Sequence, residues 1–293
     1  MKYNKIGVVG AGVIGRGVAQ SFAQAGHQVV LLDRSTSALD EARREIALGL
    51  RLLSLTDRAL RVADHAGILA KIDFTTDYLQ LSEADFVVEN VTEDWSVKQA
   101  VYQSLDRVCP SHCVFAVNTS AIPIARIAAT TARAALVVGI HFMNPVPKKQ
   151  FVELIASQYT SPNTIAITLQ ILDQLGKKAI LVGDQPGFVS NRIMMLMINE
   201  SVATLMDGVA TAEAIDSVFL NCFSHKMGPL ATADLIGLDT ILNTLDVLRE
   251  SYGTSKFEAC PLLREMVRDG RLGRKSGRGF FEYDNVKAVS NGH

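Results

Sequence analysis

Cysteine is scarce in this sequence. The 293 residues contain four cysteines, Cys109, Cys113, Cys222 and Cys260. Four thiols in a chain of this length are too few for a disulfide scaffold. Because Cys109 and Cys113 are the one close pair, the paired spacing of a zinc site is missing as well. We therefore expect ordinary free thiols and no metal site.

A large excess of charge of one sign is also missing. The chain has 29 basic and 30 acidic residues, a net charge of −1, so no bulk attraction to nucleic acid or to a membrane surface is expected. The sequence contains no run of 18 apolar residues, and "MKYNKIGVVG" leads directly into a strand pattern rather than a signal peptide. These features predict a cytoplasmic globular protein. Its length suits one large or two medium domains.

The first part of the chain alternates short apolar runs with helical patterns. This order predicts an α/β fold with a mostly parallel sheet covered by helices on both faces. Helical stretches lie between several of the runs, for example at 15–26 and 96–108. The predicted strands are residues 5–10, 28–33, 72–76, 85–89, 113–117, 135–142, 151–155 and 179–183.

The second part of the chain has long helical periodicity and no convincing strand. We predict one helix over 188–208, which Gly208 can end, and another over 229–253, which Pro229 can begin and Gly253 can end. The sequence therefore predicts an α/β domain over 1–185 and an all-α domain over 186–293. A helical unit with apolar residues on several faces often packs against a second copy of itself.

A glycine-rich turn follows the first predicted strand. "GAGVIG" reads G-x-G-x-x-G between a strand and a helix, an arrangement that lets the backbone approach a pyrophosphate. Asp33 ends the next strand, where a carboxylate accepts hydrogen bonds from a ribose and repels a 2′-phosphate. NAD is therefore the expected cofactor, although Arg34 can accommodate the phosphate of NADP. The residues of the turn are Gly10, Ala11, Gly12, Val13, Ile14 and Gly15.

His141 and Glu153 are polar residues inside two apolar runs. The prolines of "NPVP" keep the chain between these runs extended and turning, so the two side chains can face each other. Alcohol oxidation beside a nicotinamide needs a base, and imidazole titrates near the working pH. A carboxylate on its other nitrogen fixes the tautomer. A purely structural pair is the alternative, and the nucleotide motif favours catalysis.

Other polar residues follow another predicted strand or begin a predicted helix. Asn118, Thr119 and Ser120 come after the run 113–117, and Asn191 lies near the start of the first long helix of the second part. Together with His141 they can surround a hydroxyl-bearing carbon at the carboxyl edge of the sheet. Taken singly, Ser120 could instead cap the next helix, and Asn191 could bond the backbone.

Seven motifs in a fixed order resemble the 3-hydroxyacyl-CoA dehydrogenase family over nearly the whole chain. This resemblance implies a Rossmann-like domain followed by a helical domain that dimerises. It also implies NAD-dependent interconversion of a 3-hydroxyacyl thioester and its 3-oxoacyl form. The motifs are "GAGVIGRGVAQ", "VVENVTED", "NTSAIPI", "HFMNPVP" with "FVELI", "QPGFVSNRI", "MGPLATADLIGLD" and "GRKSGRGFFEY".

The same resemblance implies roles for individual residues. His141 matches the catalytic histidine and Glu153 its orienting carboxylate. Ser120 matches the serine that bonds the 3-hydroxyl near the nicotinamide, and Asn191 matches the asparagine that helps to hold the acyl group. The matched cofactor-site positions are Glu93, Lys98, Asn144 and Lys275. For the two lysines, a solvated helix or tail lysine is the alternative.

One departure from the family pattern concerns the thioester carrier. CoA-dependent members have a serine and a lysine on CoA in the helix after Asp33, at positions that fall on Gly49 and Thr56 here. Neither can place a positive charge on a phosphate, although Arg51 or Arg58 could substitute. Basic residues gather instead at Lys148, Lys149 and 271–278. They would suit an acidic acyl carrier protein, as in relatives that make polyketide extender units, whereas CoA would suit fatty acid metabolism.

Two other classes of function remain open at this point. A catalytically silent dinucleotide-binding protein would keep "GAGVIG" but need not keep the other site residues together. A dehydrogenase of a small free hydroxy acid, as in the hydroxyisobutyrate and 6-phosphogluconate group, would more often use a lysine base. "GFVSNRI" has Asn191 and Arg192 in that helix instead, which argues against the free acid.

Overall fold

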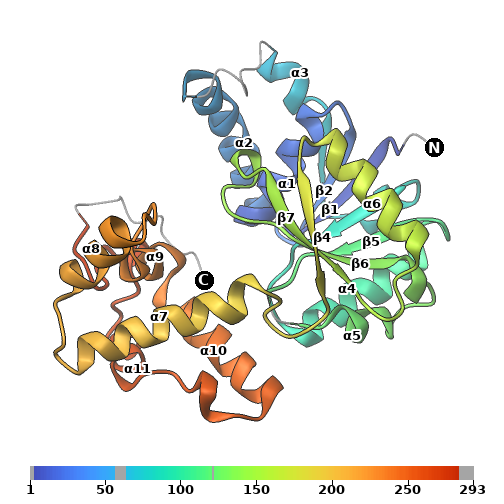
Figure 1. The fold of residues 1–293 in the computed structure, drawn as a ribbon. Helices are drawn as coiled ribbons and strands as arrows, with labels where there is room; N and C mark the ends of the chain where they lie inside the picture. The colour runs from blue at the N-terminus through green and yellow to red at the C-terminus, as the bar shows by residue number, and fades with distance from the viewer. Residues whose placement is uncertain (1–2, 57–63, 121, 284–293) are drawn as a thin grey trace. The chain divides into compact units, whose positions relative to one another are not determined.

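Two compact units make up the chain, residues 1–185 and residues 186–293 (Figure 1). The computed structural model describes residues 3–56, 64–120 and 122–283, together with their side chains except those of 54–56. Each unit has a hydrophobic core of its own. No helix among the described residues is both long and apolar enough to cross a membrane.

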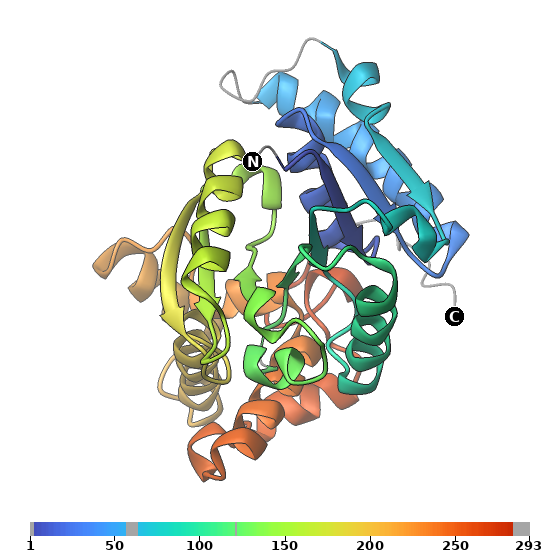
Figure 2. The same ribbon diagram turned by 90° about the vertical axis from the view of Figure 1, so that its right-hand side faces the viewer.

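An eight-stranded sheet forms the centre of the first unit (Figures 1 and 2). Its strand order is β3-β2-β1-β4-β5-β6-β7-β8, and all neighbours are parallel except β6 and β7. All eight predicted strands are confirmed. They are β1 Lys5–Val9, β2 Gln28–Leu32, β3 Ile72–Thr75, β4 Phe86–Glu89, β5 Val114–Val117, β6 Val137–His141, β7 Phe151–Ala156 and β8 Lys178–Gly183.

Helices cover both faces of this sheet, as the prediction of an α/β fold requires. Strands β4, β5 and β6 are buried along their whole length, which is typical of parallel strands between two helical layers. Side chains of α1, α2 and α6 share one core with one face of the sheet. On the other face, Tyr102 of α4 packs against Phe115 of β5, and Ile124 of α5 lies against Gly139 of β6. The elements are α1 Val13–Gln24, α2 Thr36–Thr56, α3 His65–Leu69, η2 Tyr78–Leu81, α4 Trp95–Val108, α5 Ile124–Ala128, η3 Ala134–Leu136, η4 Val146–Lys148 and α6 Pro162–Gln174.

The strand order reverses direction between β1 and β4. After β1 the chain moves outward to β2 and β3, and it then returns to the other side of β1 as β4. Connections on opposite sides of these two strands open a crevice at their carboxyl ends, the usual ligand position in open α/β sheets. The turn that begins at Gly10 and the segment 90–92 both leave the sheet at this crevice.

The second unit is helical, and no named strand occurs in its described part, residues 186–283. The predicted helix over 188–208 is confirmed, with Gly208 in a left-handed conformation (φ 68°) just after its end. The prediction of one helix over 229–253 is wrong. Gly237 has a φ of 103°, which a helix does not accommodate, and it separates two helices. The helices are α7 Ser190–Met206, α8 Ala212–Cys222, α9 Pro229–Ile236, α10 Leu238–Tyr252, η5 Ser255–Phe257, α11 Pro261–Arg268 and η6 Arg274–Ser276.

A buried carboxylate explains the motif "GRGFFEY" of this unit. Asp234 of α9 accepts hydrogen bonds of 3.0 Å from the backbone N–H of Phe280, from that of Phe281 and from the Tyr283 hydroxyl. A side chain at Gly279 would lie 1.9 Å from Asp234 Oδ1, so a glycine is needed there. Burial and the neighbouring Asp234 raise the pKa of Tyr283 to about 12. The motif therefore has a structural role, because it binds the segment 279–283 to α9.

Candidate active site

The glycine-rich turn brings the start of α1 close to the strand ends. Gly10 has a φ of 95°, and a Cβ atom there would lie 2.7 Å from the backbone oxygen of Asn90. A Cβ atom at Gly15 would lie 1.8 Å from the backbone oxygen of Gly10. At Gly12, by contrast, a Cβ atom would meet nothing within 4 Å, so the backbone is open to a ligand. This geometry suits a pyrophosphate at the N-terminus of α1.

Asp33 is anchored beside this turn at the end of β2. One carboxylate oxygen accepts a hydrogen bond from the Ala11 N–H at 2.8 Å, and the other accepts one from the Ser35 N–H at 3.0 Å. A carboxylate has room for further donors, such as two ribose hydroxyls. Asp33 and Arg34 line a cavity of about 310 Å³ at the crevice between β1 and β4. Gly10 and Gly12 of the predicted turn thus line the same recess as Asp33.

Tyr78 is a residue of this cavity that the sequence analysis did not identify. It belongs to η2 and lines the cavity together with Val97 and Val101 of α4. Burial raises the pKa of Tyr78, and the charges of Asp33 and Glu89 raise it further. The hydroxyl therefore stays protonated and can donate a hydrogen bond. A lone tyrosine in a short turn carries no motif, which is why no sequence pattern indicated it.

His141 and Glu153 face each other across two antiparallel strands. They are direct register partners at the end of β6 and near the start of β7, and His141 Nδ1 lies 2.8 Å from a Glu153 carboxylate oxygen. Their exposed fractions are 8% and 6%, so the bond is largely shielded from water. A charge-assisted bond in such surroundings holds the ring in one orientation. The structure therefore pairs the two residues as the sequence suggested.

The polar residues after β5 lie next to the end of β6. Asn118 Oδ1 accepts a hydrogen bond of 3.2 Å from the N–H of Phe142, the residue after His141. Thr119 Oγ1 and the Ser120 N–H both donate to Glu93 Oε1. Two predicted site residues, Ser120 and Glu93, are thus in direct contact. Asn118 links the loop that carries Ser120 to the end of the strand that carries His141.

Lys98 is buried in the core, which the sequence did not predict. It is fully buried in α4, in an ion pair with Glu89 at 2.8 Å, and it is not among the residues that line the cavity beside Asp33. The alternative of a solvated helix lysine is therefore wrong for Lys98. Burial raises the pKa of Glu89, and the Lys98 charge opposes that shift.

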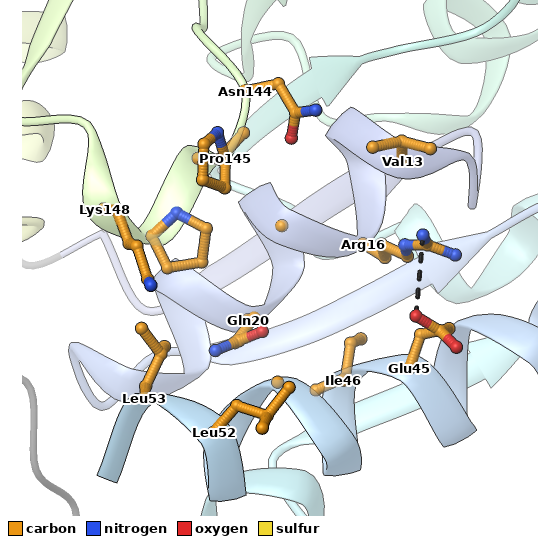
Figure 3. Close-up of a pocket in the computed structure, with 14 residues that line it drawn as sticks. Val13, Arg16, Gln20, Glu45, Ile46, Leu52, Leu53, Asn144, Pro145 and Lys148 are labelled. Carbon is orange, nitrogen blue, oxygen red and sulfur yellow. Dashed lines mark ion pairs between the residues drawn. The ribbon is translucent and has the colours of Figure 1, made fainter. Parts of the chain in front are cut away.

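A second cavity of about 290 Å³ lies between α1, α2 and the segment 144–148 (Figure 3). Its lining is mostly apolar, with Ile46, Leu52 and Leu53 on the α2 side, and Lys148 and Arg16 extend around it. Gly49 lines this cavity, and a Cβ atom there would lie 3.0 Å from Gln20 Oε1.

Asn144 also lines this second cavity, where a cis peptide bond links it to Pro145. Arg51 is exposed on α2. Thr56 lies in the last turn of that helix, whereas its side chain and Arg58 are outside the described residues.

Two predicted site residues belong to the helical unit. Asn191 is half-buried in the first turn of α7. Lys275 lies in η6, and its Nζ is 2.6 Å from Asp239 Oδ2 at the start of α10. Lys275 is therefore paired with a carboxylate of its own unit while it stays exposed to solvent, as the alternative of a solvated lysine expects. Among the described residues, no cluster of histidine, cysteine and carboxylate side chains could hold a metal ion.

Comparisons with known proteins cover almost the entire chain. Residues 5–185 match the family model of the 3-hydroxyacyl-CoA dehydrogenase NAD binding domain, and residues 187–283 match that of the corresponding C-terminal domain. A probable 3-hydroxybutyryl-CoA dehydrogenase of Bacillus subtilis is 41% identical, over 97% of this chain and 99% of that protein. A 3-hydroxybutyryl-CoA dehydrogenase of Clostridioides difficile is 40% identical, over 96% and 99%. The crystal structure of (S)-3-hydroxybutyryl-CoA dehydrogenase from Ralstonia eutropha has a TM-score of 0.90 at 40% identity and covers 97% of this chain and 100% of that one.

Proposed function

Because the chain belongs to the 3-hydroxyacyl-CoA dehydrogenase family and is thus an NAD-dependent oxidoreductase, we propose that His141 is its general base and Glu153 the residue that orients it. The observation that carries this proposal is the buried 2.8 Å bond between His141 Nδ1 and Glu153. With a catalytic enzyme family established, the alternative of a silent dinucleotide-binding protein is set aside.

The proposed reaction assigns one task to each nitrogen of His141. Nδ1–H donates to the Glu153 carboxylate, which leaves Nε2 to accept the proton of the substrate 3-hydroxyl. As the O–H bond breaks, the C3–H bond gives up a hydride and a C3=O bond forms. NAD, when bound, accepts that hydride. Glu153 stabilises the imidazolium that results, and Ser120 hydrogen-bonds the reacting oxygen.

The cofactor site is proposed at the crevice between β1 and β4. The turn over 10–15 would bind the pyrophosphate, and Asp33 would accept from the adenosine ribose, which favours NAD over NADP. Tyr78 is added as a hydrogen-bond donor in the same cavity. Glu93, Asn144 and Lys275 are kept as cofactor-site residues because of the family resemblance.

Replacement of the base tests the mechanism. We expect His141→Ala to fold and to bind NAD, with kcat reduced by roughly 10²–10⁴-fold, the usual contribution of general acid-base catalysis. Initial rates with a 3-hydroxybutyryl thioester of N-acetylcysteamine, followed by NADH absorbance, measure this effect. A kcat within tenfold of the parent enzyme would remove His141 from the role of base.

An acyl carrier protein is proposed as the carrier of the substrate, in preference to CoA. The relatives described above are named for CoA, but Gly49 lines the mostly apolar second cavity and cannot contact a phosphate with a side chain. Lys148 and Lys149 are exposed next to the same cavity. Two missing charge-assisted contacts, at roughly 1.5–3 kcal/mol each, would together weaken CoA binding by roughly 10²–10⁴-fold. Surface contacts with an acidic carrier protein would replace that affinity.

A comparison of the two thioester carriers tests the proposal of an acyl carrier protein. We expect a higher kcat/KM for a carrier-bound 3-hydroxyacyl group than for its CoA ester. The double reversal Lys148→Glu/Lys149→Glu should lower only the carrier reaction, because a short pantetheine thioester lacks the acidic surface. The matched control is Lys226→Glu/Lys256→Glu, two exposed lysines of the helical unit. If the enzyme turns over 3-hydroxybutyryl-CoA efficiently, and neither double variant changes that rate, the substrate carrier is CoA rather than an acyl carrier protein.

A homodimer is proposed through the helical unit. Val218, Leu220 and Phe223, at the end of α8 or just after it, are exposed by 47%, 40% and 65%. Several large apolar side chains at one helix end are typical of a protein interface. Light scattering coupled to gel filtration should give twice the chain mass, and Phe223→Glu should give the chain mass. A parent protein that elutes as a monomer at micromolar concentration would contradict this assembly.

A further inference from the structure

One buried lysine holds the segment that connects β6 to β7. Lys177 comes just before β8 and is 6% exposed. Its Nζ donates hydrogen bonds to the backbone oxygen of Val146 at 2.7 Å and to that of Lys149 at 2.8 Å. Val146 begins the short turn η4 and Lys149 follows it, and carbonyl oxygens at the end of a helical turn lack a donor within the turn. Lys177 therefore binds η4 at both of its ends.

The same turn packs against α1. Val146 is 2% exposed. A Cβ atom at Gly17 of α1 would lie 3.0 Å from Val146 Cβ and 3.5 Å from Pro147 Cδ, so the turn and the helix are in close contact. Two contacts thus fix the place of η4, the ammonium group of Lys177 and the surface of α1.

The place of η4 determines the shape of the second cavity. Residues 144–148 line this cavity together with α1 and α2, and Lys148 extends beside it (Figure 3). Gly49, the α2 position that falls on a CoA contact in the family, lines it as well. CoA and an acyl carrier protein both present the acyl group on a pantetheine arm, so either carrier would bring the same arm to this cavity.

We infer that Lys177 is a positioning residue for the pantetheine arm of the substrate, because it holds the wall of the second cavity in place through η4. This inference rests on the proposed function, since it takes the cavity beside Lys148 and Lys149 as the place of the thioester arm. His141 and Glu153 are register partners on β6 and β7, so a shift of η4 leaves their distance unchanged. Loss of Lys177 should therefore weaken binding of the arm and spare the chemical step.

Two thioesters of one acyl group separate these effects. 3-Hydroxybutyryl-pantetheine carries the whole arm, whereas 3-hydroxybutyryl-N-acetylcysteamine carries only the part next to the sulfur. For Lys177→Met we expect the KM of the pantetheine thioester to rise roughly tenfold, while both kcat values and the KM of the short thioester stay within about twofold of the parent. Lys178→Met removes the same charge from the adjacent, exposed residue and is the matched control, which should change none of these constants.

A second variant makes the test independent of stability. Lys177→Met leaves two carbonyl oxygens without their donor and should lower the melting temperature by several degrees. Gly17→Ala displaces η4 from the side of α1, and alanine forms helices better than glycine, so the melting temperature should stay close to that of the parent. Gly17→Ala should nevertheless raise the same KM. Because both variants act through one segment, their effects should not multiply when they are combined.

Three results would overturn the role of Lys177. One is an unchanged KM of the pantetheine thioester in Lys177→Met, and another is an equal loss of kcat/KM with both thioesters, which general destabilisation would cause. The third is an unchanged KM in Gly17→Ala, because η4 would then have no influence on the arm.

Gly49→Leu distinguishes a failure of this inference from a failure of the proposed function. Gly49 lines the second cavity, so a larger side chain there takes up part of its volume and should raise the KM of the pantetheine thioester. An unchanged KM in Gly49→Leu would refute the proposed place of the arm. A raised KM in Gly49→Leu, combined with an unchanged KM in Lys177→Met, would refute only the role of Lys177.

Discussion

Replacement of Glu153 by glutamine tests the proposed mechanism most directly. The Glu153 side chain belongs to a residue that is 6% exposed, and its carboxylate oxygen lies 2.8 Å from His141 Nδ1, so water contributes little screening to this contact. A hydrogen bond to a charged group is worth about 1.5–3 kcal/mol, and the bond strengthens as the ring gains a proton in the transition state. Loss of that energy from the barrier corresponds to a decrease in kcat of roughly 10- to 150-fold.

The assay for Glu153→Gln measures kcat at saturating NAD and saturating 3-hydroxybutyryl-N-acetylcysteamine across a series of pH values. We expect a lower kcat, a changed pH profile and a larger isotope effect on deuteration at C3, because the chemical step becomes slower. Glu83→Gln is the control, since it makes the same chemical change on an exposed side chain of the same unit. A kcat within about threefold of the parent, less than even a weak charged hydrogen bond would give, together with an unchanged pH profile would refute the reasoning.

Four further predictions concern the cofactor site and the stability of the two units. Asp33→Asn should lower the ratio of kcat/KM with NAD to kcat/KM with NADP. A parent enzyme that is equally active with both cofactors would contradict the role of Asp33. Gly15→Ala should abolish NAD binding in calorimetry, because its Cβ would lie 1.8 Å from the Gly10 backbone oxygen. Lys177, which donates to the backbone oxygens of residues 146 and 149, has a pKa that burial lowers from 10.5 to about 8. Between these values the unfolded chain holds a proton that the folded chain lacks, so parent stability should rise with pH there, by at most about 3 kcal/mol relative to Lys177→Met in denaturant titrations. Asp234→Ala leaves three donors without their acceptor and should destabilise the helical unit by about 2–4 kcal/mol in the same titrations.

The sheet and the contact between His141 and Glu153 could be predicted because each depends on a pattern that is local in sequence. Buried parallel strands form continuous apolar runs, as β4, β5 and β6 do, and all eight strands were identified from short apolar runs. His141 and Glu153 could be paired because the two prolines between them favoured a turn, and two strands joined by a short turn are usually adjacent. The glycine spacing of the turn over 10–15 needed no tertiary information either.

The remaining features depend on contacts between distant segments. Lys98 was compatible with a cofactor site or with solvent, because its burial follows from the meeting of β4 and β5 around it. Tyr78 lies in a short 3₁₀ turn without periodicity, and only the path of β2 brings it near Asp33. The break at Gly237 was missed because one glycine inside a periodic helical pattern is tolerated, at a cost of about 1 kcal/mol, and so does not by itself mark the end of a helix.

The antiparallel pairing of β6 and β7 has an evolutionary consequence. Since His141 and Glu153 are register partners, the two strands alone set their distance, and the segment 142–150 does not contribute to it. Insertions and deletions in that segment can reshape the wall of the second cavity, to which residues 144–148 contribute, while His141 and Glu153 stay in place. A slip of the register by one residue, in contrast, would turn Glu153 to the opposite face of the sheet. The hairpin thus lets the wall of the second cavity change while the distance between His141 and Glu153 stays fixed.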